Sequence, residues 1–288
     1  MKGDTMKNIG ININTEKDSN GTILDTIKKD IKSTIADSNI TVFENTSGLS
    51  RKAVEKLDFI ISLGGDGTLL GTAREIAEYN VPIMGVNIGN LGFLTEVESS
   101  EFCYAIESIS RGDYKIEERI MLECTIYSSD TLKKYICLND VVLSKGALSR
   151  MAKYEIYIDD KFYSSFTADG VIVSTPTGST AYSLSAGGPI MYPDLKLMSI
   201  TPICPHSLGI RTMVIDGKSM VDINLKKKYE SIFLTVDGQE SQELKEDDRI
   251  TVSMSKDICK LIKLDNYDYF DILRRKITSR TKECEGGK

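Results

Sequence analysis

A short apolar segment that runs into three glycines and an aspartate constrains this chain more than any other stretch. Residues Phe59–Leu63 have the composition of a buried strand, and Gly64-Gly65-Asp66-Gly67-Thr68 follows them directly. From Leu69 to Tyr79, apolar residues return at helical spacing. Glycine lets the backbone approach a ligand closely, and the first N–H groups of a helix have no acceptor within it. The stretch therefore predicts a strand, a turn and a helix N-terminus that is suited to phosphate.

Asp66 is the unexpected residue in this loop, because a carboxylate repels a neighbouring phosphate. One interpretation is that Asp66 or Thr68 caps the helix that follows. The other is that Asp66 accepts a proton from, or orients, a hydroxyl that attacks a phosphoryl group. The loop matches neither the P-loop pattern nor G-x-G-x-x-G. The residues of this loop by themselves leave both roles open.

The composition of the chain argues against some classes of binding partner. A chain of 288 residues is long enough for one large domain or two modest ones. Its formal net charge of −6 argues against nucleic-acid binding and against an anionic membrane, and it has no apolar run that could span a bilayer. The N-terminus lacks the apolar segment of a signal peptide. The six cysteines form no C-x-x-C pair, so we expect buried free thiols in a reducing cytoplasm.

The first part of the chain, residues 1–113, alternates strands with helices. Apolar patterns predict strands at 8–13, 40–43, 59–63 and 81–86, and helices at 23–35, 51–56, 69–79 and 101–111. Such alternation predicts a Rossmann-like α/β domain with a parallel sheet, whose ligands bind at the carboxyl ends of the strands. The loop at Gly65–Gly67 and a second loop at Asn87–Phe93 both follow strands at that end.

The pattern changes near Tyr114, where apolar residues begin to alternate. Residues 114–264 predict a β-rich domain of mostly antiparallel strands, with turns at Asp159-Asp160 and Asp237-Gly238. The tail, residues 265–288, has apolar residues near helical spacing and is expected to pack back toward the first domain.

A second motif lies inside the β-rich half, from Asp169 to Pro189. An apolar strand runs into a Ser/Thr-rich segment that is interrupted by Pro176 and Gly178. This segment is either an ordinary surface loop or the wall of a pocket for a polar ligand, and its flanks favour the pocket. Earlier in the chain, Asn139-Asp140 is either a turn before a strand or a pair that hydrogen-bonds ligand hydroxyls.

Taken together, these motifs resemble the motif series of the NAD kinase family, in the same order and over nearly the whole chain. The matching stretches are Gly64–Thr68, Asn87–Leu94, Leu138–Asp140 and Ser174–Pro189. The first is only moderately specific, because diacylglycerol and sphingosine kinases and phosphofructokinases carry similar loops. The long Ser174–Pro189 stretch is highly specific. Gly71 departs from some members, which carry a basic residue at that position.

The resemblance implies an α/β N-terminal domain, a β-rich C-terminal domain and an active site in the interdomain cleft. It implies transfer of the γ-phosphoryl group of ATP to the 2′-hydroxyl of the adenosine ribose of NAD, with Asp66 as proton acceptor. The substrate-binding positions that it implies are Asp66, Gly67, Asn139, Asp140, Arg150, Thr167, Asp169, Thr177, Thr180, Ala181, Tyr182, Ser183, Leu184, Ser185 and Gln239.

The resemblance further implies a divalent cation, Mg²⁺, that accompanies ATP, and a cytoplasmic homo-oligomer, a dimer or tetramer. It leaves the donor open between ATP and inorganic polyphosphate, and it leaves open whether NADH is accepted. Two other functions compete. A diacylglycerol-type lipid kinase shares the glycine-aspartate loop, but the acidic chain lacks a basic or amphipathic membrane-facing segment. A non-catalytic dinucleotide sensor would gain nothing from an acid beside phosphates.

Overall fold

The computed structural model describes residues 6–89, 92–129, 131–146, 150–207, 209–226, 231–245 and 247–284. The chain divides into two compact units, which are described one at a time. Unit 1 comprises Met1–Glu117 and Lys260–Lys288, and unit 2 comprises Glu118–Cys259. The chain passes from one unit to the other within two long strands, β6 (Tyr114–Tyr127) and β17 (Arg249–Leu264).

Unit 1 is built on a parallel sheet, as its β/α alternation predicts. Four neighbouring strands follow the order β2-β1-β3-β4, and the last residues of β17 run parallel to β4. A short strand, β5, also pairs with β4. The bounds of these strands are β1 Asn8–Ile13, β2 Asn39–Glu44, β3 Phe59–Gly64, β4 Ile83–Asn87 and β5 Val97–Glu98.

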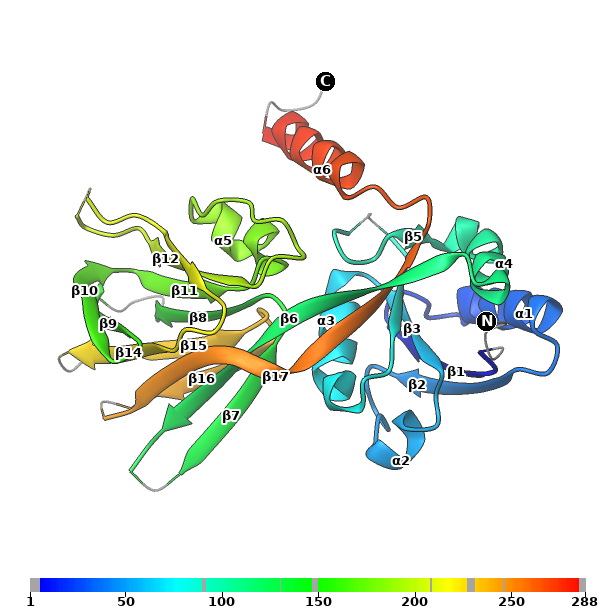
Figure 1. The fold of residues 1–288 in the computed structure, drawn as a ribbon, viewed down its shortest axis with the longest axis horizontal. Helices are drawn as coiled ribbons and strands as arrows, with labels where there is room; N and C mark the ends of the chain where they lie inside the picture. Colours follow the sequence, from blue (N-terminus) through cyan, green and yellow to red (C-terminus); the bar gives the residue numbers. More distant parts are fainter. Residues whose placement is uncertain are drawn as a thin grey trace. The chain divides into compact units, whose positions relative to one another are not determined.

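Helices cover both faces of this sheet (Figure 1). On one face, α1 and α4 pack side by side, and Ile27, Ile31 and Ile106 contribute to a core with the strand residues Ile9 and Ile11. The other face carries α3, which also contacts β1, β3 and β4. The helices are α1 Thr22–Thr34, α2 Arg51–Val54, α3 Asp66–Ile76, α4 Phe102–Arg111 and α6 Tyr269–Cys284, with 3₁₀ turns at Ser99–Glu101 and Ala77–Tyr79.

The order of strands places a topological switch point between β1 and β3. The helix after β1 and the helix after β3 lie on opposite faces, so the loops at the carboxyl ends of these strands separate and leave a crevice. The two ends are adjacent, since the N–H of Asn14 donates to the carbonyl of Leu63 at 2.9 Å. This is the position where open α/β sheets bind ligands, and the glycine-aspartate loop occupies it.

Unit 2 is an antiparallel β structure, again as predicted. One sheet has six strands in the order β13-β12-β11-β8-β15-β16, and a second contains β10-β9-β14-β17 with β6 and β7. The strands not yet given are β7 Leu132–Cys137, β8 Asp140–Lys145, β9 Ala152–Ile158, β10 Lys161–Ala168, β11 Gly170–Ser174, β12 Leu197–Ile203, β13 Met213–Asp216, β14 Val221–Lys226, β15 Ile232–Val236 and β16 Glu240–Leu244.

Side chains from both sheets of unit 2 form one core. Tyr154 and Ile223 come from one sheet, and Val171 and Leu234 come from the other. At the predicted Asp159-Asp160 turn, φ is +50° and +60°, which joins β9 to β10 as a tight hairpin. This left-handed geometry explains why two short polar residues stand between two apolar strands.

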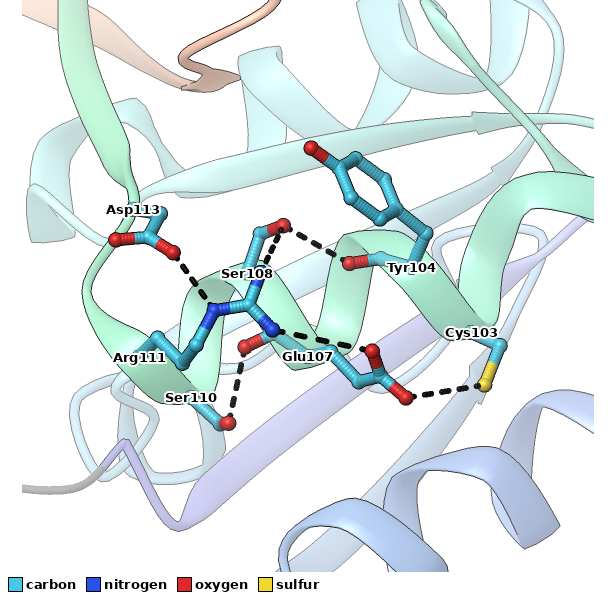
Figure 2. A network of polar contacts seen from close by, with 7 residues as sticks. All are labelled: Cys103, Tyr104, Glu107, Ser108, Ser110, Arg111 and Asp113. Carbon is cyan, nitrogen blue, oxygen red and sulfur yellow. Dashed lines mark hydrogen bonds and ion pairs between the residues drawn. The ribbon is translucent and has the colours of Figure 1, made fainter.

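The cysteines agree with the prediction only in part. All those whose surroundings the structure describes are free, and Cys124, Cys137 and Cys259 are buried. Cys103 and Cys204 are exposed, so their predicted burial is wrong. Figure 2 shows the reason at Cys103, which lies on the outer face of α4, where its thiol donates to the Glu107 carboxylate.

None of the helices in the described ranges has the length and apolar composition that crossing a membrane requires.

Candidate active site

The glycine-aspartate loop forms the sharp turn from β3 into α3. The helix begins at Asp66, earlier than the apolar spacing predicts, with Gly65 as its N-cap residue. The Asp66 carboxylate accepts hydrogen bonds from three backbone N–H groups of the loop after β4, those of Phe93 (2.8 Å), Leu94 (3.0 Å) and Thr95 (3.1 Å). The Thr95 hydroxyl donates a fourth, at 3.1 Å. The capping interpretation is therefore wrong for Asp66, which is the first residue of α3 and bonds to another loop.

Thr68 takes part of the capping role instead. Its hydroxyl oxygen accepts a hydrogen bond from the N–H of Gly65 at 3.4 Å and lies 3.5 Å from the side-chain amide of Asn14. Asp66 is half-buried and Gly67 is exposed, so both can be reached from solvent. From the described residues of the loop, one Asp66 oxygen, Oδ2, accepts a single hydrogen bond and retains a lone pair for a ligand hydroxyl.

Lys17 is a candidate site residue that sequence reasoning missed. It lies in the loop after β1, and its ammonium extends over the glycine turns that follow β3 and β4. A Cβ added at Gly65 would lie 2.8 Å from the Lys17 Nζ, and one at Gly89 would lie 3.7 Å from it. Glycine at position 65 thus leaves room for a cation beside the N-terminus of α3. In the sequence, Lys17 is marked only by its place in the polar loop after the first strand.

In unit 2, three strand ends bring several predicted residues together. Strand β8 begins at Asp140, β11 ends at Ser174 and β15 ends at Val236. Asp140 pairs in register with Ser174, and Val141 pairs with Val236. The loops at these ends therefore lie at one edge of the six-stranded sheet. They carry Asn139, Asp140, Thr177, Thr180, Ala181 and Gln239, and the short helix α5 (Tyr182–Ser185) follows.

Asp237 holds the Asn139-Asp140 pair in place. The sequence pattern predicted Asp237 only as a turn residue. Its carboxylate accepts the backbone N–H groups of Leu138 (3.2 Å), Asn139 (2.8 Å) and Asp140 (3.3 Å). Asp140 is buried. Burial and the charge of Asp237 raise the pKa of Asp140 to about 7, while a hydrogen bond from the Tyr182 backbone acts against this shift. That bond also places Tyr182 beside the Asn139-Asp140 pair.

Many hydroxyls of the Ser/Thr-rich segment bond within the protein. Thr175 donates to the carbonyl of Leu138 at 2.6 Å, and Ser179 donates to that of Pro176 at 2.6 Å. The Ser183 hydroxyl pairs with that of Thr201 at 3.2 Å. These side chains shape the segment rather than project from it. Tyr182 and Ser185 are exposed, and Thr180 and Ser183 are buried; Ala181 and Leu184 are intermediate.

Close backbone contact ties this segment to Asn139. A Cβ added at Gly178 would lie 2.2 Å from the carbonyl oxygen of Asn139, so glycine is required there. Nearby, Thr177 accepts a hydrogen bond at 3.3 Å from Arg119, a buried guanidinium of β6. Sequence reasoning missed Arg119, because it ends the charged run Glu117-Glu118-Arg119, and such a run looks solvent-exposed.

The remaining predicted residues lie apart from this group. Asp169 precedes β11 and pairs with Lys145 at 3.3 Å, at the end of the strand opposite Ser174. The length of β11 separates the two ends by roughly 13 Å. Thr167 lies near Asp169, and its carbonyl accepts the N–H of His206 at 2.9 Å. Arg150 is exposed. The structure therefore divides the predicted unit 2 residues into two groups.

Comparison with known proteins identifies the family. The ATP-NAD kinase N-terminal domain matches residues 4–114, and the ATP-NAD kinase C-terminal domain matches residues 138–264. An NAD kinase from Clostridium botulinum (strain Kyoto / Type A2) is 53% identical over 281 residues, which cover 98% of this chain and 100% of that protein.

Two solved structures share the fold. The crystal structure of yeast NADH kinase complexed with NADH has a TM-score of 0.84 at 25% identity, covering 93% of this chain and 86% of that one. An NAD kinase from Archaeoglobus fulgidus in complex with ATP has a TM-score of 0.76 at 25% identity, covering 95% and 99%. A parallel α/β unit with a glycine-aspartate loop, joined to an antiparallel β unit, is thus a nucleotide-kinase architecture. The chain belongs to the NAD kinase family.

Proposed function

We propose that this NAD kinase transfers the γ-phosphoryl group of ATP to the 2′-hydroxyl of the adenosine ribose of NAD, which yields NADP. The observation that carries the proposal is the setting of Asp66. Its carboxylate is held at the start of α3, at the switch point of the sheet, by four hydrogen bonds, and Oδ2 accepts one of them from the described part of the loop, which leaves it a lone pair for a hydroxyl. A fixed carboxylate beside a helix N-terminus can orient a hydroxyl and receive its proton during phosphoryl transfer.

The other predicted residues take binding roles in this proposal. Gly67 lies against the ligand, and Asn139 with Asp140 binds the ribose and base through amide and carboxylate groups. Thr180–Ser185 line the dinucleotide. Further contacts come from Arg150, Thr167, Asp169, Thr177 and Gln239.

ATP brings the cation that phosphoryl transfer requires. Within the described residues, no group of three or more His, Cys, Asp and Glu side chains is arranged to hold a metal. Triphosphate oxygens are good ligands for Mg²⁺, so the divalent cation enters as part of the substrate complex. We further propose a cytoplasmic homo-oligomer with no nucleic-acid or membrane partner.

A coupled assay tests the function directly. Purified protein is incubated with ATP, Mg²⁺ and NAD, and NADP is detected with an NADP-specific dehydrogenase. NADP formation that requires both substrates supports the proposal. Binding of NAD without turnover would instead support a dinucleotide sensor, and phosphorylation of diacylglycerol in place of NAD would support a lipid kinase. Replacing ATP with inorganic polyphosphate identifies the donor.

Lys17→Ala is expected to raise the KM for ATP roughly ten-fold, because a hydrogen bond between an ammonium and a phosphate contributes about 1.5–3 kcal/mol. The difference from the unmodified enzyme should shrink as salt rises, since the contact is exposed. Steady-state kinetics at two ionic strengths measure both effects. Lys29→Ala, an exposed lysine of α1, is the matched control and should behave as the unmodified enzyme. Equal KM values in the two variants would exclude Lys17 from phosphate binding.

Gly178→Ala is expected to weaken NAD binding by about ten-fold or more, because the added methyl displaces the Asn139 backbone and with it Asp140. Calorimetric titration with NAD measures the loss. Gly209→Ala is the matched control, since the nearest described atom to a Cβ there is the Ser207 hydroxyl, at 4.0 Å. Unchanged affinity in Gly178→Ala would show that the Asn139-Asp140 pair does not bind the dinucleotide.

A further inference from the structure

The position of Asp66 depends on the 92–95 loop, the segment Gly92–Thr95. Three N–H groups and one hydroxyl of this loop converge on the Asp66 carboxylate. The contact is close, because a Cβ added at Gly92 would lie 1.8 Å from Asp66 Oδ1. The loop backbone and the Asp66 carboxylate are thus in direct contact as well as hydrogen-bonded.

Leu94 and Thr95 are buried, yet one side of this loop faces a cavity. Leu94, within the loop, and Glu96, the residue after it, line a cavity of about 430 Å³ in unit 1. The other lining residues include Ile262, Tyr267, Asp268 and Ile272. A segment that faces a cavity lacks part of the dispersion contacts that fix a core residue. Hydrogen bonds and ion pairs therefore contribute to holding the loop in place.

One such contact follows the loop directly. Glu96 forms an ion pair with the Nζ of Lys263, which comes from the end of β17, and the two side chains are only 11% and 5% exposed. The same ammonium lies 4.5 Å from the centre of the Tyr267 ring. The segment of β17 that carries Lys263 pairs with β4 through Leu261 and Ile83, so it belongs to the sheet.

A buried ammonium is unfavourable unless a carboxylate compensates it. Burial lowers the pKa of Lys263, and the charge of Asp66 opposes this shift. The ammonium therefore interacts with both carboxylates, directly with Glu96 and through space with Asp66. Removing either member of the pair leaves an uncompensated charge beside the loop that holds Asp66.

We propose that Glu96 and Lys263 are positioning residues for the phosphoryl-transfer step: their ion pair anchors the 92–95 loop to β17 and thereby keeps the Asp66 carboxylate in its reactive place. The anchoring of the loop by this ion pair does not depend on bound substrate. Its consequence for turnover rests on the proposed role of Asp66 as proton acceptor, so the two are tested by separate measurements.

The anchor is tested in the free protein by amide hydrogen exchange. In Glu96→Gln and Lys263→Met, the amides of Phe93, Leu94 and Thr95 should exchange about 10- to 100-fold faster than in the unmodified protein. Lys263→Arg keeps the charge and should preserve slow exchange. The control is Asp113→Asn, which removes a partner of Arg111 from the exposed ion-pair network at the end of α4 (Figure 2). It should change none of these rates. Unchanged exchange in Glu96→Gln would overturn the proposal.

Kinetics test the consequence for the reaction. Each single variant should lower kcat about 10- to 100-fold, as expected for a misplaced catalytic group, and leave the KM for NAD within a few-fold. The double variant should be no worse than either single one, because both remove the same anchor. If Lys263→Met does not fold, Glu96→Gln, which keeps the side-chain shape, carries the test alone. Normal kcat with fast exchange, or additive losses in the double variant, would overturn the proposal, whereas Asp66→Asn separately tests the role of Asp66.

Discussion

Replacing Asp66 with Asn is expected to lower turnover by roughly 10²–10⁴-fold, because the amide cannot receive the proton of the ribose hydroxyl. The affinity for NAD should stay within a few-fold, since the contribution of Asp66 is to the transition state rather than to binding. Steady-state kinetics of NADP formation, with NAD binding measured separately, give both quantities. Near-normal turnover would remove Asp66 from the chemistry.

The structure adds a second effect of this substitution. An Asn side chain has one acceptor oxygen, so its NH₂ group would face at least one of the N–H donors of the 92–95 loop. Leaving a donor unsatisfied is expected to cost about 1–3 kcal/mol of stability, which a melting curve detects. Thr95→Val is the matched control: it removes one donor to Asp66 but keeps the carboxylate. It should lose stability and lower turnover far less than Asp66→Asn does.

The NAD affinity of the unmodified enzyme is expected to rise as the pH increases through about 7, because burial and the charge of Asp237 raise the pKa of Asp140 to that value. Only the ionised carboxylate accepts hydrogen bonds from two adjacent ribose hydroxyls. Asp140→Asn should abolish this pH dependence and weaken binding at pH 8 by about 1–3 kcal/mol. Calorimetric titrations from pH 6 to pH 8 measure the profile, and a profile that persists in Asp140→Asn would rule out Asp140 as its source.

The same group makes stability depend on pH. In the unfolded chain Asp140 ionises near 3.8, whereas in the folded protein it keeps its proton up to about 7. The folded state thus binds more protons across this window, so the contribution of Asp140 is complete below pH 4 and is lost as the pH rises toward 7. Asp140→Asn should gain stability relative to the unmodified protein over this range. Asp160→Asn, in an exposed turn, is the control and should show no such gain.

Local patterns in the sequence were enough to predict the class of each unit. The spacing of Ile27 and Ile31 marks one face of a helix, and the alternation of Tyr154 and Ile156 marks one face of a strand. The Asp159-Asp160 turn follows from the tolerance of short polar residues for positive φ. These patterns depend only on residues that are close in the sequence, so helices, strands and turns can be predicted from one sequence. The glycine-aspartate loop is equally local, which is why its turn into a helix could be predicted.

Only the tertiary structure decided which groups surround the reactive residues. Asp66 is bound by donors 27 to 29 residues away, and Asp140 is held by Asp237, 97 residues away. The buried Lys263 and Glu96 are 167 residues apart. A pattern of polar and apolar residues indicates which side of an element faces the core. It does not indicate which distant element lies opposite, because that follows from the order in which strands pair and from the close packing of their side chains.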